Sequence, residues 1–293
     1  MKTPFKSFIG GNAGMARRLA HDKRANLRKR VLSAAVLGPL VLGVVWLGGW
    51  LFQTAVVVTA VLAVREWVRM IAPGPLGRSF YLSCSAIALV MVLDVAAGPL
   101  VAFGAALALA LVLAVVPWAG SARVTGADRR IAAFGVPYVG ASCVALTWLR
   151  SDPGVGMLLI LFLLLTVWAN DIGAFVVGRG LGGPRLAPSI SPAKTWAGFW
   201  GGITAAGLVG GLVALVAGAQ APLAAVVLGA VLAVVGQGGD LFESAIKRRY
   251  KVKDSGQLIP GHGGLLDRID GLVAAAPVLA LFQAVVGSRL NWL

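Results

Sequence analysis

Acidic residues are scarce in this sequence, and nearly half of them gather in one short stretch. The chain has 293 residues and only 11 Asp and Glu. Five of these lie within residues 240–270, namely Asp240, Glu243, Asp254, Asp267 and Asp270. Lys and Arg residues are interspersed among them. Carboxylates hold Mg²⁺, and Lys and Arg hold phosphate oxygens. The mixture therefore indicates a metal-bound nucleoside triphosphate, handled by positioning and charge neutralisation rather than by a protein nucleophile.

Helical spacing brings several of these side chains onto common faces. On a helix, positions 240, 244, 247 and 248 share one face, which carries a carboxylate, a hydroxyl, an ammonium and a guanidinium. Asp267 and Asp270 share a face in the same way. Between the two helical pieces, Gly263-Gly264 can let backbone amides approach an anion closely. Each piece alone has a simpler interpretation: residues 247–253 as a basic loop, residues 267–270 as a helix start, and Asp171 as an interfacial cap.

Composition indicates which elements must position these residues. Hydrophobic residues make up 58% of the chain and charged residues 13%, whereas soluble domains carry about a quarter charged residues. A water-soluble enzyme and a disordered chain are both excluded. Apolar runs suited to the roughly 30 Å hydrocarbon core lie at about 31–47, 50–70, 79–96, 99–117, 131–149, 155–177, 197–218, 222–243 and 265–287. The sequence predicts an all-α, polytopic integral membrane protein with about nine transmembrane helices.

The basic residues predict the orientation of these helices. With a cytoplasmic N-terminus, nine alternating spans place 24 of the 26 Lys and Arg inside and only Arg150 and Arg289 outside, as the positive-inside rule requires. The net charge of +15 therefore indicates membrane topology, and no nucleic-acid partner is expected. We predict a basic cytoplasmic tail over 1–30, N-terminal transmembrane helices over 31–150 and a C-terminal transmembrane catalytic region over 151–293. The compact, basic-tailed chain suits a bacterial cytoplasmic (inner) membrane, with the active site facing the cytoplasm.

The combined string over residues 244–270 is more specific than its parts. It runs Ser-Ala-Ile-Lys-Arg from Ser244, continues through Lys253-Asp254, and ends in Ile-Pro-Gly-His-Gly-Gly-Leu-Leu-Asp-Arg-Ile-Asp at Asp270. This string resembles the signature of the phosphatidate cytidylyltransferases, or CDP-diacylglycerol synthases. Two weaker stretches, 171–179 and 191–198, also resemble the family. Many members carry Lys and Glu where this chain has Ala193 and Ala197, so any contact made by those side chains is absent here.

The resemblance implies a reaction and its participants. CTP and phosphatidic acid would give CDP-diacylglycerol and pyrophosphate in phospholipid biosynthesis, by attack of the lipid phosphate on the α-phosphorus of CTP. Mg²⁺ is the implied cofactor, and a second, monovalent cation such as K⁺ stays open. The implied partners are CTP, phosphatidic acid, membrane lipids and a second copy of the chain in a homodimer.

Residue clustering and the resemblance together define a candidate site. The expected catalytic residues are Asp240, Lys247, Arg248, Asp267, Arg268 and Asp270, with Asp240, Asp267 and Asp270 as metal ligands. The expected substrate-binding residues are Asp171, Ser191, Lys194, Thr195, Ser244, Lys253, Asp254, His262, Gly263 and Gly264. For His262, a phosphate contact and a structural role are both open.

Two other classes of function remain possible at this stage. A CTP-dependent polyprenol or phytol kinase-like enzyme would transfer the γ-phosphoryl group and release CDP. An ion-coupled transporter would use intramembrane acids as ion sites. Inverted repeats and acids at mid-span would favour the transporter, whereas the acids here cluster near predicted cytoplasmic ends.

Overall fold

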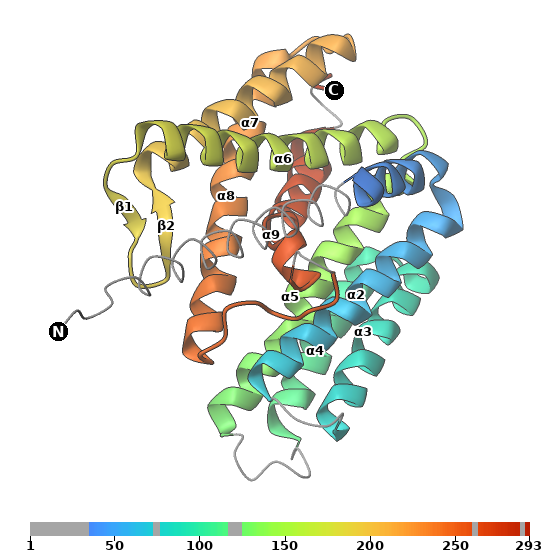
Figure 1. Cartoon of the computed structure of the whole chain (residues 1–293). Helices are drawn as coiled ribbons and strands as arrows, with labels where there is room; N and C mark the ends of the chain where they lie inside the picture. The colour runs from blue at the N-terminus through green and yellow to red at the C-terminus, as the bar shows by residue number, and fades with distance from the viewer. Residues whose placement is uncertain (1–34, 73–76, 117–124, 260–262, 288–290) are drawn as a thin grey trace, which may run out of the picture.

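The computed structural model describes residues 35–72, 77–116, 125–259, 263–287 and 291–293. Most of this is helical (Figure 1). The helices are Ala35–Leu47, α2 (Gly49–Ile71), α3 (Arg78–Ala97), α4 (Pro99–Val115), α5 (Gly126–Ser151), α6 (Gly156–Leu181), α7 (Trp196–Val216), α8 (Pro222–Arg249) and α9 (Leu266–Phe282), which continues into the short π-helix η1 (Gln283–Gly287). Strands β1 (Arg185–Ala187) and β2 (Ser191–Thr195) form an antiparallel hairpin. The predicted tail and His262 lie outside the described residues.

The predicted fold class is confirmed. Within the described ranges, seven helices are long and apolar enough to cross a membrane. Two shorter apolar helices, Ala35–Leu47 and α4, coincide with the other two predicted spans. The count of nine and the cytoplasmic N-terminus stay predictions. The β1–β2 hairpin is an addition that hydropathy did not indicate, because its strands are short and polar.

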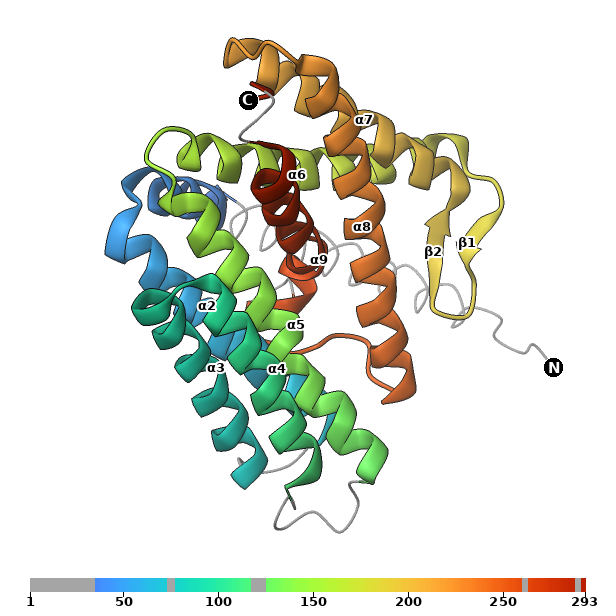
Figure 2. The ribbon, with the colours of Figure 1, turned by 180° about the vertical axis from the view of Figure 1, so that it is seen from behind.

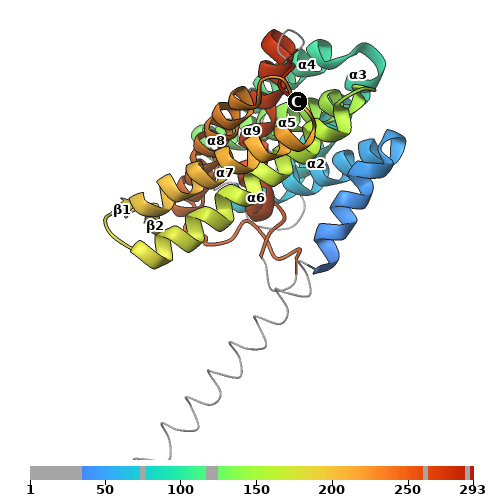
Figure 3. The ribbon, with the colours of Figure 1, turned by 90° about the horizontal axis from the view of Figure 1, so that it is seen from above.

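The helices form two groups joined by α9. Helices α2 to α5 pack together, and α6, α7 and α8 make the second group (Figures 1 and 2). Helix α9 packs against both α5 and α8. Seen from above, α6 and α7 run side by side (Figure 3), and the hairpin joins their ends. Helix α9, which carries the predicted catalytic residues Asp267, Arg268 and Asp270 near its start, therefore lies between the two groups.

Small residues allow the close helix contacts around this region. A Cβ atom at Gly201 would lie 2.5 Å from Cβ of Val177, so α7 packs against α6 without room for a side chain. A Cβ atom at Gly239 would lie 2.5 Å from Cβ of Ala274 and 2.9 Å from the carbonyl oxygen of Asp270. Membrane helices associate through such small-residue contacts because lipid supplies no hydrophobic driving force between them. The tight α8–α9 contact brings Asp270 close to Asp240, the residue that follows Gly239.

The hairpin ends in a helix cap. Thr195 is the N-cap of α7, and its Oγ1 accepts a hydrogen bond of 3.1 Å from the amide of Gly198, which satisfies one of the unpaired amides at a helix start. Register pairs Thr195 with Arg185, and Arg185 donates to the carbonyl of Ala193 over 3.2 Å. The cap and the hairpin together fix the position of Lys194, the residue between them.

Candidate active site

A cavity of about 1030 Å³ lies among α6, the hairpin, α7, α8 and the start of α9. Its polar lining residues include carboxylates, cations and amides. They are Asn170, Asp171, Arg179, Arg185, Lys194, Thr195, Gln237, Asp240, Lys247, Lys253, Asp254, Asp267, Arg268 and Asp270. Mixed charge of this kind, gathered among apolar helices in a chain with 13% charged residues, marks the cavity as the candidate active site.

Most of the predicted site residues line this cavity. They are Asp171, Lys194, Thr195, Asp240, Lys247, Lys253, Asp254, Asp267, Arg268 and Asp270. Five others do not line it: Ser191, Ser244, Arg248, Gly263 and Gly264. Ser191 lies on β2, Ser244 and Arg248 lie on α8, and Gly263 and Gly264 come just before α9. The structure thus assembles residues that lie between positions 171 and 270 of the chain.

Asp240 on α8 is paired with the hairpin. Lys194 Nζ lies 2.6 Å from Asp240 Oδ2, and the pair is partly exposed. Ser244, one helical turn further along α8, donates to Asp240 Oδ1 over 3.2 Å. Ser244 therefore contacts Asp240 rather than the cavity. The Lys194–Asp240 pair brings one cation and one carboxylate together at the cavity wall.

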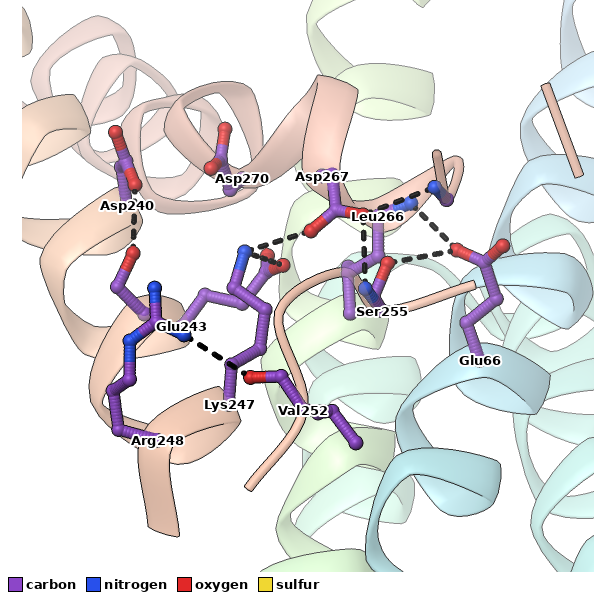
Figure 4. A network of polar contacts seen from close by, with 12 residues as sticks. Glu66, Asp240, Glu243, Lys247, Arg248, Val252, Ser255, Leu266, Asp267 and Asp270 are labelled. Carbon is purple, nitrogen blue, oxygen red and sulfur yellow. Dashed lines mark hydrogen bonds and ion pairs between the residues drawn. The ribbon is translucent and has the colours of Figure 1, made fainter. Parts of the chain in front are cut away.

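Lys247 lies between two carboxylates (Figure 4). Its Nζ lies 2.7 Å from Asp267 Oδ1 on α9 and 3.1 Å from Glu243 Oε1 on its own helix. Glu243 is fully buried, and Lys247 is 7% exposed. Burying a charge is costly unless it is paired. Lys247 is therefore a fixed cation held in the cavity wall.

Asp267 accepts three hydrogen bonds. Besides Lys247, the backbone amides of Ser255 and Gly264 donate to its Oδ2 over 2.9 and 3.0 Å. A carboxylate offers about four acceptor positions, so most of its capacity is already used. The Gly264 amide, which we expected to face a substrate anion, instead donates to this carboxylate.

The predicted metal ligands Asp240, Asp267 and Asp270 stay a prediction, and the structure shows the contacts of each carboxylate. Across the described residues, no three His, Cys, Asp or Glu side chains are grouped to hold a metal ion, although Asp240, Asp267 and Asp270 all line the cavity. Asp267 accepts hydrogen bonds from Lys247 and two loop amides. Asp240 and Asp270 interact electrostatically, and Asp171 interacts with both. Two carboxylates facing a cavity are the protein donors Mg²⁺ ordinarily uses when substrate phosphates complete its shell.

Asp171 is hydrogen-bonded to one of a pair of buried amides that also line the cavity. Asn170 Nδ2 donates to Asp171 Oδ1 over 3.2 Å. Gln237 Nε2 donates to Asn170 Oδ1 over 2.8 Å and lies 3.2 Å from the carbonyl oxygen of Phe199. Asn170 and Gln237 are 4% and 5% exposed. This buried chain connects α6, α7 and α8 and orients the Asp171 carboxylate.

Arg248 and Tyr250 tie the end of α8 to its surroundings. Arg248 donates to the carbonyl oxygens of Ile190 in the hairpin and Val252 in the following loop. The Tyr250 hydroxyl donates to Asp128 Oδ1 at the start of α5 over 2.7 Å. Partial burial and this hydrogen bond raise the pKa of Tyr250 to about 12, so the hydroxyl stays a donor at neutral pH. Arg248 therefore has contacts that position the hairpin, and its expected phosphate contact stays a prediction.

Sequence reasoning missed several residues of this region. Asn170, Gln237, Arg179 and Arg185 line the cavity but were not among the predicted site residues. Glu66 on α2 was also missed, although it contacts the loop that holds Asp267. An acidic residue inside an apolar span is itself a signal of function, so Glu66 was detectable. The amides carry no charge and gave no comparable signal.

The fold and the site define a membrane-embedded enzyme with a cavity of carboxylates and cations. The profile of the family described as "Cytidylyltransferase family" matches residues 28–286. The chain is 39% identical over 264 residues to the phosphatidate cytidylyltransferase of Brucella suis biovar 1 (strain 1330), covering 89% of this chain and 94% of the relative. It is 36% identical over 280 residues to the protein of that name from Pseudomonas aeruginosa, covering 89% and 98%. The chain belongs to the cytidylyltransferase family and is a nucleotidyltransferase.

Proposed function

We propose that this chain transfers the cytidylyl group of CTP to phosphatidic acid, giving CDP-diacylglycerol and pyrophosphate in phospholipid synthesis. The observation that carries the proposal is the cavity, where carboxylates and cations from β2, α8 and α9 meet in a chain whose relatives are named phosphatidate cytidylyltransferases. Its volume of about 1030 Å³ is at the upper end of the roughly 300–1,000 Å³ of small-molecule sites. A nucleotide and a lipid headgroup can therefore occupy it together.

The reaction requires little covalent chemistry from the protein. A phosphate oxygen of phosphatidic acid forms a bond to the α-phosphorus of CTP, and the bond from that phosphorus to the bridging oxygen breaks. Pyrophosphate leaves with the electron pair of that bond. The lipid phosphate is already a nucleophile, so the work of the site is to bring two anions together and neutralise the leaving group. The cavity cations Lys194, Lys247 and Arg268 suit this task.

The Lys194–Asp240 pair suggests how the site accepts its substrate. Both members are partly exposed and line the cavity. When the triphosphate enters, Lys194 can exchange Asp240 for a phosphate oxygen, which leaves Asp240 free to bind a cation. Each charge is therefore paired before and after binding, and neither state leaves an uncompensated charge in the wall.

We propose that Asp240 and Asp270 are the carboxylates that would hold a Mg²⁺ ion. Both line the cavity on adjacent helices, and Asp171 lies near them. Bound there with the substrate, Mg²⁺ would neutralise charge on the triphosphate and the leaving pyrophosphate. The three donors to Asp267 support the proposal that it holds Lys247. A requirement for K⁺ stays a prediction.

We place this site at the cytoplasmic face of a bacterial inner membrane. Support comes from contacts that bring several basic chain segments together: Tyr250 with Asp128, Arg248 with the hairpin, and Glu66 with Ser255. The side chain of Arg150, in the last turn of α5, instead contacts the carbonyls of Val45 and Trp46 near the C-terminal end of helix Ala35–Leu47. These pairings agree with the alternation of nine spans from a cytoplasmic N-terminus. The homodimer stays a prediction, to be tested by the mass of the purified particle in detergent.

The test is transfer of label from nucleotide to lipid. The purified chain is incubated in detergent with phosphatidic acid, Mg²⁺ and CTP labelled at the α-phosphate. We expect label in the lipid phase, release of pyrophosphate, and loss of both with EDTA or in Asp240→Asn. Asp94→Asn is the matched control, because Asp94 is a carboxylate of α3 that bonds Thr147 and does not line the cavity.

Other products would identify another reaction. Release of CDP when a polyprenol or phytol is supplied, with no label in phosphatidate-derived lipid, would replace the proposal with the kinase-like alternative. A folded preparation that releases neither CDP nor pyrophosphate would overturn the proposed activity, and ion flux in proteoliposomes would be measured next.

A further inference from the structure

Glu66 is a buried carboxylate on α2, outside the cavity and in the half of the chain without the recognised signature. Its side chain is 3% exposed. It does not line the main cavity, and it approaches the loop between α8 and α9 and the first residue of α9 (Figure 4). A carboxylate buried in a membrane span is costly and requires a partner or a function.

Within the part of the chain that the structure describes, both hydrogen-bond partners of Glu66 belong to the segment that holds Asp267. Glu66 Oε2 accepts a hydrogen bond of 2.8 Å from the backbone amide of Leu266, the first residue of α9, and one of 3.2 Å from Ser255 Oγ. The Ser255 backbone amide donates to Asp267. Glu66 and Asp267 therefore hold the same loop from opposite sides, and Ser255 contacts both.

The fit of the loop against Glu66 is close. A Cβ atom at Gly256 would lie 2.2 Å from Glu66 Oε1, and one at Gly264 would lie 2.7 Å from Glu66 Oε2 and 2.0 Å from Ser255 Oγ. Neither glycine position has space for a side chain while Glu66 stays in place. The two glycines thus allow the backbone to reach the carboxylate, which explains their presence on steric grounds.

We propose that Glu66 is a positioning residue for the transfer reaction, and this rests on the proposed function. Glu66 fixes the loop and the start of α9, the loop fixes Asp267, and Asp267 fixes Lys247 at the cavity wall. The carboxylate also lies at the positive end of the α9 dipole, where negative charge is favourable. Through this chain of contacts, the N-terminal helices set the geometry of a site built from the C-terminal ones.

Kinetics of single and double variants test the proposal. Misplacing a catalytic group by about 1 Å can lower a rate by about 100-fold, so Glu66→Ala should lower kcat roughly 10- to 100-fold, with a smaller change in the KM for CTP. Glu66→Gln retains one acceptor oxygen and should retain more activity than Glu66→Ala. The double variant Glu66→Ala/Asp267→Asn should be no slower than Asp267→Asn alone, because both changes break one chain of contacts.

A merely structural carboxylate would give a different pattern. In that case the fold reductions in kcat caused by Glu66→Ala and by Asp267→Asn would multiply in the double variant. Alternatively, Glu66→Ala would lower the melting temperature without changing kcat in the folded fraction. Asp94→Asn, a carboxylate in another span that bonds a neighbouring helix, is the control for such an effect. Multiplicative losses, or a Glu66→Ala enzyme with unchanged kcat, would overturn the proposal.

Hydrogen–deuterium exchange tests the same link without any substrate. In Glu66→Ala, the peptide that contains Ser255 and Gly264 should exchange faster, because the amides bonded to Asp267 lose the support of the loop. Asp94→Asn should leave that peptide unchanged. Unaltered exchange in Glu66→Ala would refute the positioning role even if the wild-type chain failed to label phosphatidate, so the two proposals fail by different measurements.

Discussion

The separate roles proposed for Asp267 and Asp240 can be distinguished by two isosteric substitutions. Asp267→Asn removes the charge that pairs with Lys247 and leaves one acceptor oxygen where the carboxylate accepted three donors. The two side chains of this pair are only 7% and 9% exposed. Asp240→Asn removes the charge that pairs with Lys194, in a pair whose side chains are 36% and 23% exposed.

The magnitudes follow from burial. Breaking a buried ion pair costs about 3–5 kcal/mol, and Glu243 still holds Lys247 at 3.1 Å in the Asp267 variant. Asp267→Asn should therefore lower the free energy of unfolding by an amount near the lower end of this range, about 3 kcal/mol. If the same free energy is lost in the transition state, kcat should fall roughly 100-fold. A partly exposed pair contributes less than about 1 kcal/mol to stability, so Asp240→Asn should fold almost normally.

The assay is Mg²⁺ titration of label transfer, combined with thermal unfolding in detergent. Asp267→Asn should melt at a lower temperature and turn over more slowly, but its half-saturating Mg²⁺ concentration should stay that of the wild type. Asp240→Asn should melt normally and require more Mg²⁺. If Asp267→Asn raised the Mg²⁺ requirement as much as Asp240→Asn does, Asp267 would be a metal ligand and the reasoning from its three donors would be refuted.

Three further predictions follow from the helix contacts and the cavity wall. Gly239→Val should abolish folding or activity, because its Cβ would lie 2.5 Å from that of Ala274; retention of a monodisperse, active enzyme on size exclusion would contradict this. Gln237→Leu leaves the buried Asn170 oxygen without its donor and should destabilise the protein by about 1–3 kcal/mol, measured as a lower melting temperature. Lys194→Met should raise the KM for CTP roughly 10- to 100-fold by loss of a charge-assisted contact of about 1.5–3 kcal/mol, and unchanged steady-state kinetics would remove Lys194 from the site.

The apolar runs predicted the helices well because a bilayer imposes strong requirements on sequence. Every buried backbone group must be satisfied within its own helix, so long apolar runs have little alternative to helix. The predicted run at 222–243 continues as helix to Arg249, because the polar end of α8 packs against its neighbours rather than lipid. The hairpin over 185–195 escaped prediction because short polar strands have no hydropathy signal.

The residues that line the cavity were predicted better than the contacts between them. Helical spacing correctly brought Asp240 and Ser244 together on α8, where they are hydrogen-bonded. Spacing along one chain cannot give the partner of a side chain on another helix. For this reason the hydrogen bonds from Lys247 and two loop amides to Asp267 were not predicted, and the role of Asp267 as a metal ligand stays a prediction.

The sequence by itself determined the membrane-spanning helical class, the stretch that carries the chemistry and the kinds of ligand it suits, because composition and local spacing report these directly. Tertiary structure decided which charges pair with which. Asp240 pairs with Lys194 across 46 positions of the sequence, and Glu66 contacts Leu266 across 200. Such pairings depend on how closely glycine-rich helices approach one another. The partner that this approach provides decides whether a buried charge is stabilised.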